Sequence, residues 1–132
     1  MQTAQRINTK TLYAGAMNKV EAISKIKLSL LNGAQVIAPK TVDSDKFIEE
    51  QAVKLLSNVI EPVIVKITSA CFPEYDYEKY LSSEVWAIAH DRDSWLLTLA
   101  DENEFALGFG DSTNEIMMHG FSSSNALGEW CT

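Results

Sequence analysis

The chain has 132 residues and a mass of 14.7 kDa, the size of one ordinary domain, so we expect a single domain over residues 1–132. Its 46% hydrophobic content is too high for a disordered chain, and no apolar run approaches the ~18 residues that span a membrane. The N-terminus also lacks the apolar core of a secretory signal. Together these features favour a soluble cytoplasmic protein with no membrane partner.

The net charge of −7 is distributed unevenly along the chain. Residues 1–66 carry nine Lys or Arg against six Asp or Glu, whereas residues 67–132 carry only Lys79 and Arg92 against twelve acids. A surface with one sign of charge attracts an oppositely charged protein and repels nucleic-acid phosphate. We therefore expect a basic protein partner and no direct nucleic-acid ligand.

The first half of the chain predicts two helices. Residues 1–12 are polar and predict a frayed arm or a short edge strand. Apolar residues at helical spacing then predict a helix over 18–31, with Asn18 and Glu21 as an N-cap pair and Asn32-Gly33 at its end. Alternation of Ile26, Leu28 and Leu30 leaves a strand as the alternative there.

The second helix is predicted over 43–60, capped by Asp43 or Ser44 and stopped by Pro62. Residues 35–38 predict a short strand before it. The β-branched run 63–68 predicts extended chain, although Pro62 is also compatible with the first turn of a further helix.

Tyrosines alternate with acids in residues 74–80. Helical spacing predicts a short helix that packs Tyr77, Tyr80 and Leu81 on the sheet. The alternative is a contact surface with Tyr75 and Tyr77 as anchors, because tyrosine combines an apolar body with a hydrogen-bonding tip.

Four short apolar runs, 84–90, 94–100, 104–110 and 115–121, are separated by turn-forming residues. They predict an antiparallel meander, and residues 122–130 predict a short C-terminal helix capped by a serine, with Leu127 and Trp130 in the core. The expected fold is α+β, with a meander of four or five strands covered by the two N-terminal helices and the C-terminal helix.

The alternation within these runs also predicts which side chains share a face. Phe105, Leu107 and Phe109 should point one way, with Ala106 and Gly108 opposite, where small residues would let a helix or a partner approach. We expect the matching apolar stripe on the other strands to come from the following residues: Trp95, Leu97, Leu99, Trp86 and Ile88.

Successive turns of a meander fall at opposite ends of the sheet. The first and third turns should therefore gather four acids at one end, and the second turn three at the other. The first group is Asp91, Asp93, Asp111 and Glu115, and the second is Asp101, Glu102 and Glu104. Turn preference alone explains many of these acids, but it does not explain the near absence of bases after Lys66.

No catalytic, metal or cofactor motif is found in the sequence, and Cys71 and Cys131 match no metal or redox spacing. We expect two free thiols, with a disulfide as the alternative. The expected function is therefore not enzymatic. It is that of an acidic protein-binding protein, such as a bacterial or phage immunity protein that inhibits a basic toxin or nuclease, with Asp91, Asp93, Asp111, Glu115, Tyr75 and Tyr77 at the interface.

Two alternatives to this function remain. One is an acidic secretion chaperone, which would be a homodimer that binds an unfolded segment. The other is a small ligand-binding or enzymatic domain that uses the sheet face around Trp86, His90 and His119.

Overall fold

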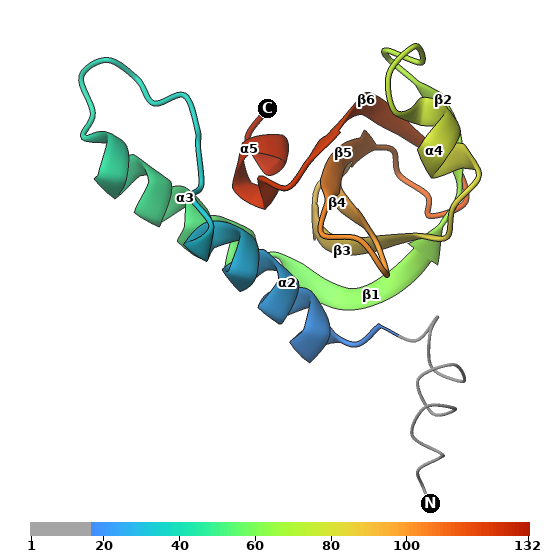
Figure 1. The fold of residues 1–132 in the computed structure, drawn as a ribbon, viewed down its shortest axis with the longest axis horizontal. Helices are drawn as coiled ribbons and strands as arrows, with labels where there is room; N and C mark the ends of the chain where they lie inside the picture. Colours follow the sequence, from blue (N-terminus) through green and yellow to red (C-terminus); the bar gives the residue numbers. More distant parts are fainter. Residues whose placement is uncertain (1–16) are drawn as a thin grey trace, which may run out of the picture.

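The computed structural model describes residues 17–132, so the arm or edge strand expected over residues 1–12 lies outside the described residues. Within that range the fold is α+β, with a six-stranded mixed sheet and four helices (Figure 1). The helices are α2 (Lys19–Leu31), α3 (Ser44–Ser57), α4 (Tyr77–Leu81) and α5 (Ala126–Trp130). The strands are β1 (Val59–Val65), β2 (Ile67–Ala70), β3 (Val85–Asp91), β4 (Ser94–Leu99), β5 (Phe105–Phe109) and β6 (Ile116–Ser123).

The strand order is β1-β3-β4-β5-β6-β2, and the predicted meander of four or five strands is only roughly matched. Strands β3 to β6 pair antiparallel in chain order. Strand β1 adds to the β3 edge antiparallel, while β2 pairs with β6 in parallel, which makes the sheet mixed. The run 63–68, predicted to be extended, supplies parts of both added strands.

The two edge strands are consecutive in the chain, separated only by Lys66. At this junction the Lys66 amide donates to the Thr113 carbonyl at 2.8 Å, and the Ile116 amide donates to the Lys66 carbonyl at 2.9 Å. Because one continuous extended segment pairs with β3 first and with β6 afterwards, the sheet must curl, and Figure 1 shows the strands arranged in a ring.

Helix α2 has the predicted capping box, with the Asn18 side chain accepting from the Glu21 amide, and it ends before Gly33, whose φ of 103° only glycine adopts readily. Helix α3 is capped by Asp43 as predicted. The predicted end at residue 60 is wrong, because Val59 already belongs to β1 and pairs with Ala89. Pro62 lies within β1, an edge strand, where its missing N–H is tolerated.

Three smaller predictions also differ from the structure. Residues 35–38 form no strand. In α4, Tyr80 is buried and Tyr77 half-buried as expected, but Leu81 is exposed. The cap of α5 is Asn125, whose side chain accepts from the Gly128 amide, rather than a serine. Leu127 is buried in the core and Trp130 packs against it, as predicted.

The core is divided between the two faces of the sheet. Helices α2, α3 and α5 cover the outer face, where Ile26, Leu55 and Leu127 pack on Trp86, Ile88 and Phe105 (Figure 1). The inner face encloses a second core with α4 at its side, and its members include Tyr80, Ala87, Trp95, Leu97, Leu99, Ala106 and Met118.

The register shows that one predicted face assignment was wrong. Leu97 is opposite Ala106, so Trp95, Leu97 and Leu99 face inward with Ala106, not outward with Phe105. A Cβ at Gly108 would lie 2.7 Å from Ile116 Cγ2 and 2.9 Å from Leu97 Cδ1. The small residues Ala106 and Gly108 therefore make room for the side chains that fill the interior of the curled sheet.

Candidate protein-interaction surface

The structure brings the first and third turns of the meander together. The Gly110 amide donates to the Asp93 carbonyl at 2.8 Å, which links the β3–β4 turn to the segment after β5. Trp95 then donates from Nε1 to the Gly110 carbonyl at 2.8 Å, and the His90 ring stacks on the Trp95 ring with centroids 3.7 Å apart. Backbone bonds and one buried tryptophan thus hold the two turns in place.

We define the acidic end as Asp91, Asp93, Asp111 and Glu115, all of which are exposed. Among residues 17–132, no ion pair involves any of these four carboxylates. Arg92 lies in the same turn with a φ of 61°, and it is the one non-glycine residue of the described range with positive φ. The acidic end therefore presents four exposed carboxylates that form no ion pair within residues 17–132.

We define the paired end as Asp101, Glu102 and Glu104, around the β4–β5 turn. Lys79 of α4 forms ion pairs with Glu102 at 2.8 Å and Glu104 at 2.6 Å. Lys25 of α2 donates to the carbonyls of Leu99 at 3.2 Å and Glu102 at 2.8 Å. Lysines from two helices thus bind this turn, Lys79 through carboxylates and Lys25 through backbone carbonyls.

The pKa shifts at the paired end arise from the contacts of Lys79 with Glu102 and Glu104 and from burial. Hydrogen bonds to Glu102 and Glu104 raise the pKa of Lys79. Burial alone would raise the pKa of Glu104, but hydrogen bonds, above all that from Lys79, hold it below its usual value. Burial and the Glu104 charge raise the pKa of the neighbouring Tyr80. The Glu104 carboxylate is therefore held in its charged form by contacts within the protein.

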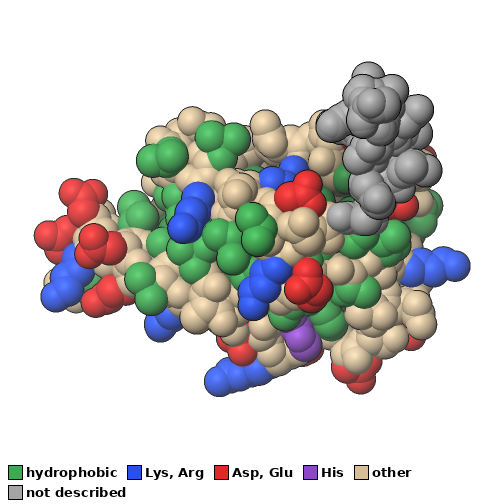
Figure 2. Space-filling view, turned by 90° about the horizontal axis from the view of Figure 1, so that it is seen from below, with side chains coloured by type: hydrophobic (Ala, Val, Ile, Leu, Met, Phe, Trp, Pro, Cys, Tyr) green, Lys and Arg blue, Asp and Glu red, His purple; other side chains and the backbone are tan. Residues whose placement is uncertain are grey.

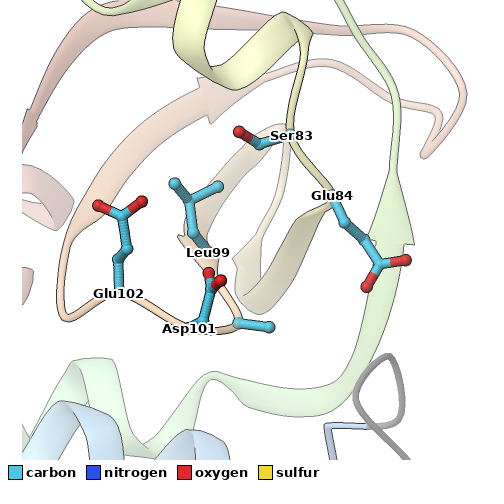
Figure 3. Close-up of a pocket in the computed structure, with 6 residues that line it drawn as sticks. Ser83, Glu84, Leu99, Asp101 and Glu102 are labelled. Atoms are coloured by element: carbon cyan, nitrogen blue, oxygen red, sulfur yellow. The ribbon is translucent and has the colours of Figure 1, made fainter. Parts of the chain in front are cut away.

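A pocket of about 340 Å³ opens beside this turn, lined by Ser83, Glu84, Leu99, Ala100, Asp101 and Glu102 (Figure 3). In Figure 3 the Glu84 carboxylate points away from the pocket, toward β1. Glu102, one of its remaining carboxylates, is already held by Lys79. Apart from acidic side chains, the only reactive side chain that lines the pocket is the Ser83 hydroxyl, so the lining has no base or activated nucleophile for catalysis.

An exposed aromatic face lies on the outside of β5 and β6. We define it as Phe72, Tyr75, Phe109, Met117, His119 and Phe121. Phe121 packs against Tyr75 at a centroid distance of 4.5 Å and Phe72 at 5.2 Å, and His119 makes T-shaped contacts with Phe72, Phe109 and Phe121. Tyr75 is 59% exposed, Phe72 41% and Met117 38%, which is high for neighbouring large apolar side chains.

Gly120 positions Phe72 and Tyr75, the two rings of the aromatic face that lie outside the sheet. Its φ is 126°, and a Cβ there would lie 2.5 Å from the Phe72 carbonyl oxygen. The loop 71–76 can therefore lie directly on β6, where the Phe72 amide donates to the His119 carbonyl at 3.0 Å and the Asp76 amide to the Gly120 carbonyl at 2.9 Å. Asp76 Oδ2 also accepts from the Ser122 amide at 2.8 Å, which fixes the end of the loop.

The aromatic face and the acidic end are continuous. Phe109 and Met117 are directly paired across β5 and β6, so their side chains share the outer face. Asp111 follows Phe109 by two residues and Glu115 precedes Met117 by two. The described residues thus form one surface, with exposed rings on one side and uncompensated carboxylates on the other.

Of the predicted anchors, Tyr75 belongs to this surface, whereas Tyr77 is half-buried and packs against the inner core. No interface role was predicted from the sequence for Phe72, Phe109 and Phe121, and His119 was predicted only for the alternative ligand site. The sequence feature that points to the β6 members of this surface is alternation along the strand. Ile116 and Met118 are buried, while Met117, His119 and Phe121 are not. Phe109, predicted to share a face with Phe105 and Leu107, is half-buried and does not belong to the outer core under the helices.

The residues of the alternative ligand site do not converge. Trp86 is buried in the outer core, His90 stacks on inward-facing Trp95, and His119 belongs to the aromatic face. Across residues 17–132, no three metal-ligating side chains are grouped so that they could hold an ion, and no helix has the length and apolarity to cross a bilayer. Cys71 and Cys131 are free thiols, with Cys71 Sγ 3.9 Å from Met117 Sδ.

Comparisons with known proteins give no family for this chain. No family model matches it, and neither a curated protein nor a solved structure is significantly similar to it.

Proposed function

We propose that the protein binds a basic protein partner through the acidic end and the adjoining aromatic face, and that it acts as an inhibitor or immunity protein that neutralises a basic toxin or nuclease. The observation that carries this proposal is the continuity of uncompensated carboxylates with exposed aromatic rings. Aromatic side chains are the commonest anchors of protein interfaces, and charged residues at the rim steer association.

Two other parts of the surface support the same choice of site. Figure 2, seen from the side of α2 and β1, mixes basic, acidic and apolar side chains, as an ordinary solvated surface does. At the paired end, Lys79 already pairs with the carboxylates of Glu102 and Glu104. The acidic end is therefore the place where a basic partner gains attraction without displacing a bond within the protein.

Charge reversal tests the proposal. The immobilised protein is used to capture partners from a lysate of the source organism at low and high salt, and the association rate of the captured protein is then measured. The variant Asp91→Lys, Asp93→Lys, Asp111→Lys should slow association at low salt by roughly tenfold or more. Its stability should change by less than about 0.5 kcal/mol, because these side chains are exposed.

The matched control is Asp45→Lys, Glu49→Lys, Glu50→Lys on α3. It changes the net charge by the same amount as the acidic-end variant, at exposed positions that are distant in sequence from the acidic end. It should associate faster than the acidic-end variant. Equal slowing by both variants would assign the effect to net charge alone and would remove the acidic end from the interface.

A further inference from the structure

The exposed rings of the aromatic face present flat π surfaces. The Tyr75 and Phe121 planes are inclined by 36°, and the Phe72 and Phe121 planes by 45°. The rings are therefore splayed instead of packed face to face, and both Phe72 and Tyr75 keep a large exposed fraction. Such faces carry the negative part of the ring quadrupole and attract cations.

Carboxylates lie at the border of the same surface. Asp111 and Glu115 extend from the paired strand residues Phe109 and Met117, and Glu74 is exposed beside Tyr75. Asp111 and Glu115 lie in the turn between the strands, and two residues of chain span at most about 7 Å, so one long side chain can lie on the Phe109 ring and reach a carboxylate. The surface thus offers a flat apolar contact and an anionic acceptor to the same ligand group.

These two features together match arginine better than lysine. The guanidinium group is planar, weakly hydrated and able to stack on an aromatic face while its N–H groups bind a carboxylate in a bidentate manner. The lysine ammonium is a strongly hydrated point charge that gains from the carboxylates but less from the rings. We propose that this surface selects arginine side chains, presented by an arginine-rich segment of the basic partner; this inference rests on the proposed function.

Charge complementarity determines which class of ligand fits this surface best. An apolar partner would have to desolvate Asp111 and Glu115 without pairing them, which is costly. A single-stranded nucleic acid would gain from base stacking on the rings but would bring phosphates toward the acidic end. An arginine-rich segment satisfies both halves of the surface.

The test uses the full chain and two probes of equal length and charge, a peptide of alternating arginine and glycine and the same peptide with lysine for each arginine. Affinity is measured by fluorescence anisotropy at low ionic strength. The arginine peptide should bind roughly tenfold tighter than the lysine peptide. Equal affinities, or no binding of either peptide, would overturn the proposal.

Variants separate stacking from charge. Phe72→Ala with Tyr75→Ala should bring the ratio of the two affinities close to one, whereas Tyr75→Phe should keep it. Asp111→Asn with Glu115→Gln should weaken both peptides alike. The control Leu31→Ala removes an apolar side chain that is 84% exposed on α2 and should leave both affinities unchanged. An arginine preference that survives the loss of both rings would contradict the stacking role.

These outcomes are independent of the test of the proposed function. If the acidic-end reversal slows association with the captured partner while the two peptides bind equally, the protein-binding function stands and only the arginine preference fails. If the reversal has no effect on the captured partner, the proposed function itself fails.

Discussion

The two ends of the curled sheet both gather acidic residues from turns, but they are held together by different forces. At the paired end, Lys79 and Lys25 reach in from two helices and bind the carboxylates and carbonyls of the β4–β5 turn. At the acidic end, Trp95 and backbone hydrogen bonds hold the turns, and no lysine of the described range pairs with the acids. Charge contributes to the structure at one end and remains available at the other.

This difference shows that the number of acids in a turn does not indicate its role. Both groups of acids satisfy the same backbone preference for turns. What separates them is whether the fold brings a basic side chain to them, which depends on contacts between residues distant in the chain. Lys79, for example, is far from Glu102 in sequence and meets it only because α4 lies against the sheet.

The largest effect is expected from Trp95, which holds the acidic end from inside. Trp95→Ala should lower the free energy of unfolding by about 3–5 kcal/mol, because it removes a large side chain that is 6% exposed. Trp95→Phe should cost less while losing the bond to Gly110, worth about 1 kcal/mol. Urea denaturation measures both losses. Equal stability of the alanine variant and the wild type would show that the turns are held by other contacts.

An intermediate effect is expected at the paired end. Lys79→Met should lower the melting temperature at pH 7, because it leaves the Glu104 carboxylate, only 16% exposed, without its cation. Neutralising the acidic end with Asp91→Asn and Asp111→Asn should cause no such loss. Thermal melts of the two variants compare the ends directly, and a similar loss in both would contradict the distinction between them.

The pH dependence of the Lys79→Met effect provides an independent check. The pKa of Glu104 is lowered in the folded protein, so its stabilisation is present above the ordinary value of 4.5 and is lost as the pH falls below it. The gap in stability between wild type and Lys79→Met should therefore narrow as the pH falls below 4.5. A gap that stays constant through this range would show that the lysine acts through packing and not through charge.

The smallest effect is expected at Arg92, the basic residue between Asp91 and Asp93. Its φ of 61° is unfavourable for a side chain, so Arg92→Gly should be more stable than Arg92→Ala by about 1 kcal/mol. Both variants remove the same positive charge and should accelerate association with a basic partner to the same extent. Chemical denaturation and association kinetics measure the two effects separately. Faster association in only one variant would assign the change to turn geometry.

The sequence predicted the local elements better than their arrangement. Caps such as Asn18 and Asp43 and turns such as Asp91–Asp93 are determined by neighbouring residues, and they lie where predicted. Alternation within one strand is also local, but the register between strands is not. Trp95, Leu97 and Leu99 were therefore placed on the wrong face, because both faces of β4 are apolar and only the pairing of Leu97 with Ala106 distinguishes them.

The difference between local and long-range contacts also explains which parts of the candidate site could be predicted. The grouping of Asp93 with Asp111 follows from the order of turns in a meander and could be predicted. The aromatic face could not, because it depends on loop 71–76 lying on β6, which a positive φ at Gly120 allows. Tyr75 and Tyr77 are close in sequence, yet α4 turns Tyr77 inward, and alternating tyrosines alone do not reveal which of them remains outside.

The junction at Lys66 links the closure of the sheet to the order in which the chain is synthesised. Ile67 pairs with Ile116, so β2 emerges almost fifty residues before the strand that completes it. Contacts between such distant segments slow folding, because the entropy of a long loop is lost before the contacts form. Until β6 has been made, β2 has no neighbour and its edge is open to other chains. The nascent protein thus depends on the synthesis of β6 to close the sheet, and the β2 edge is prone to aggregation until then.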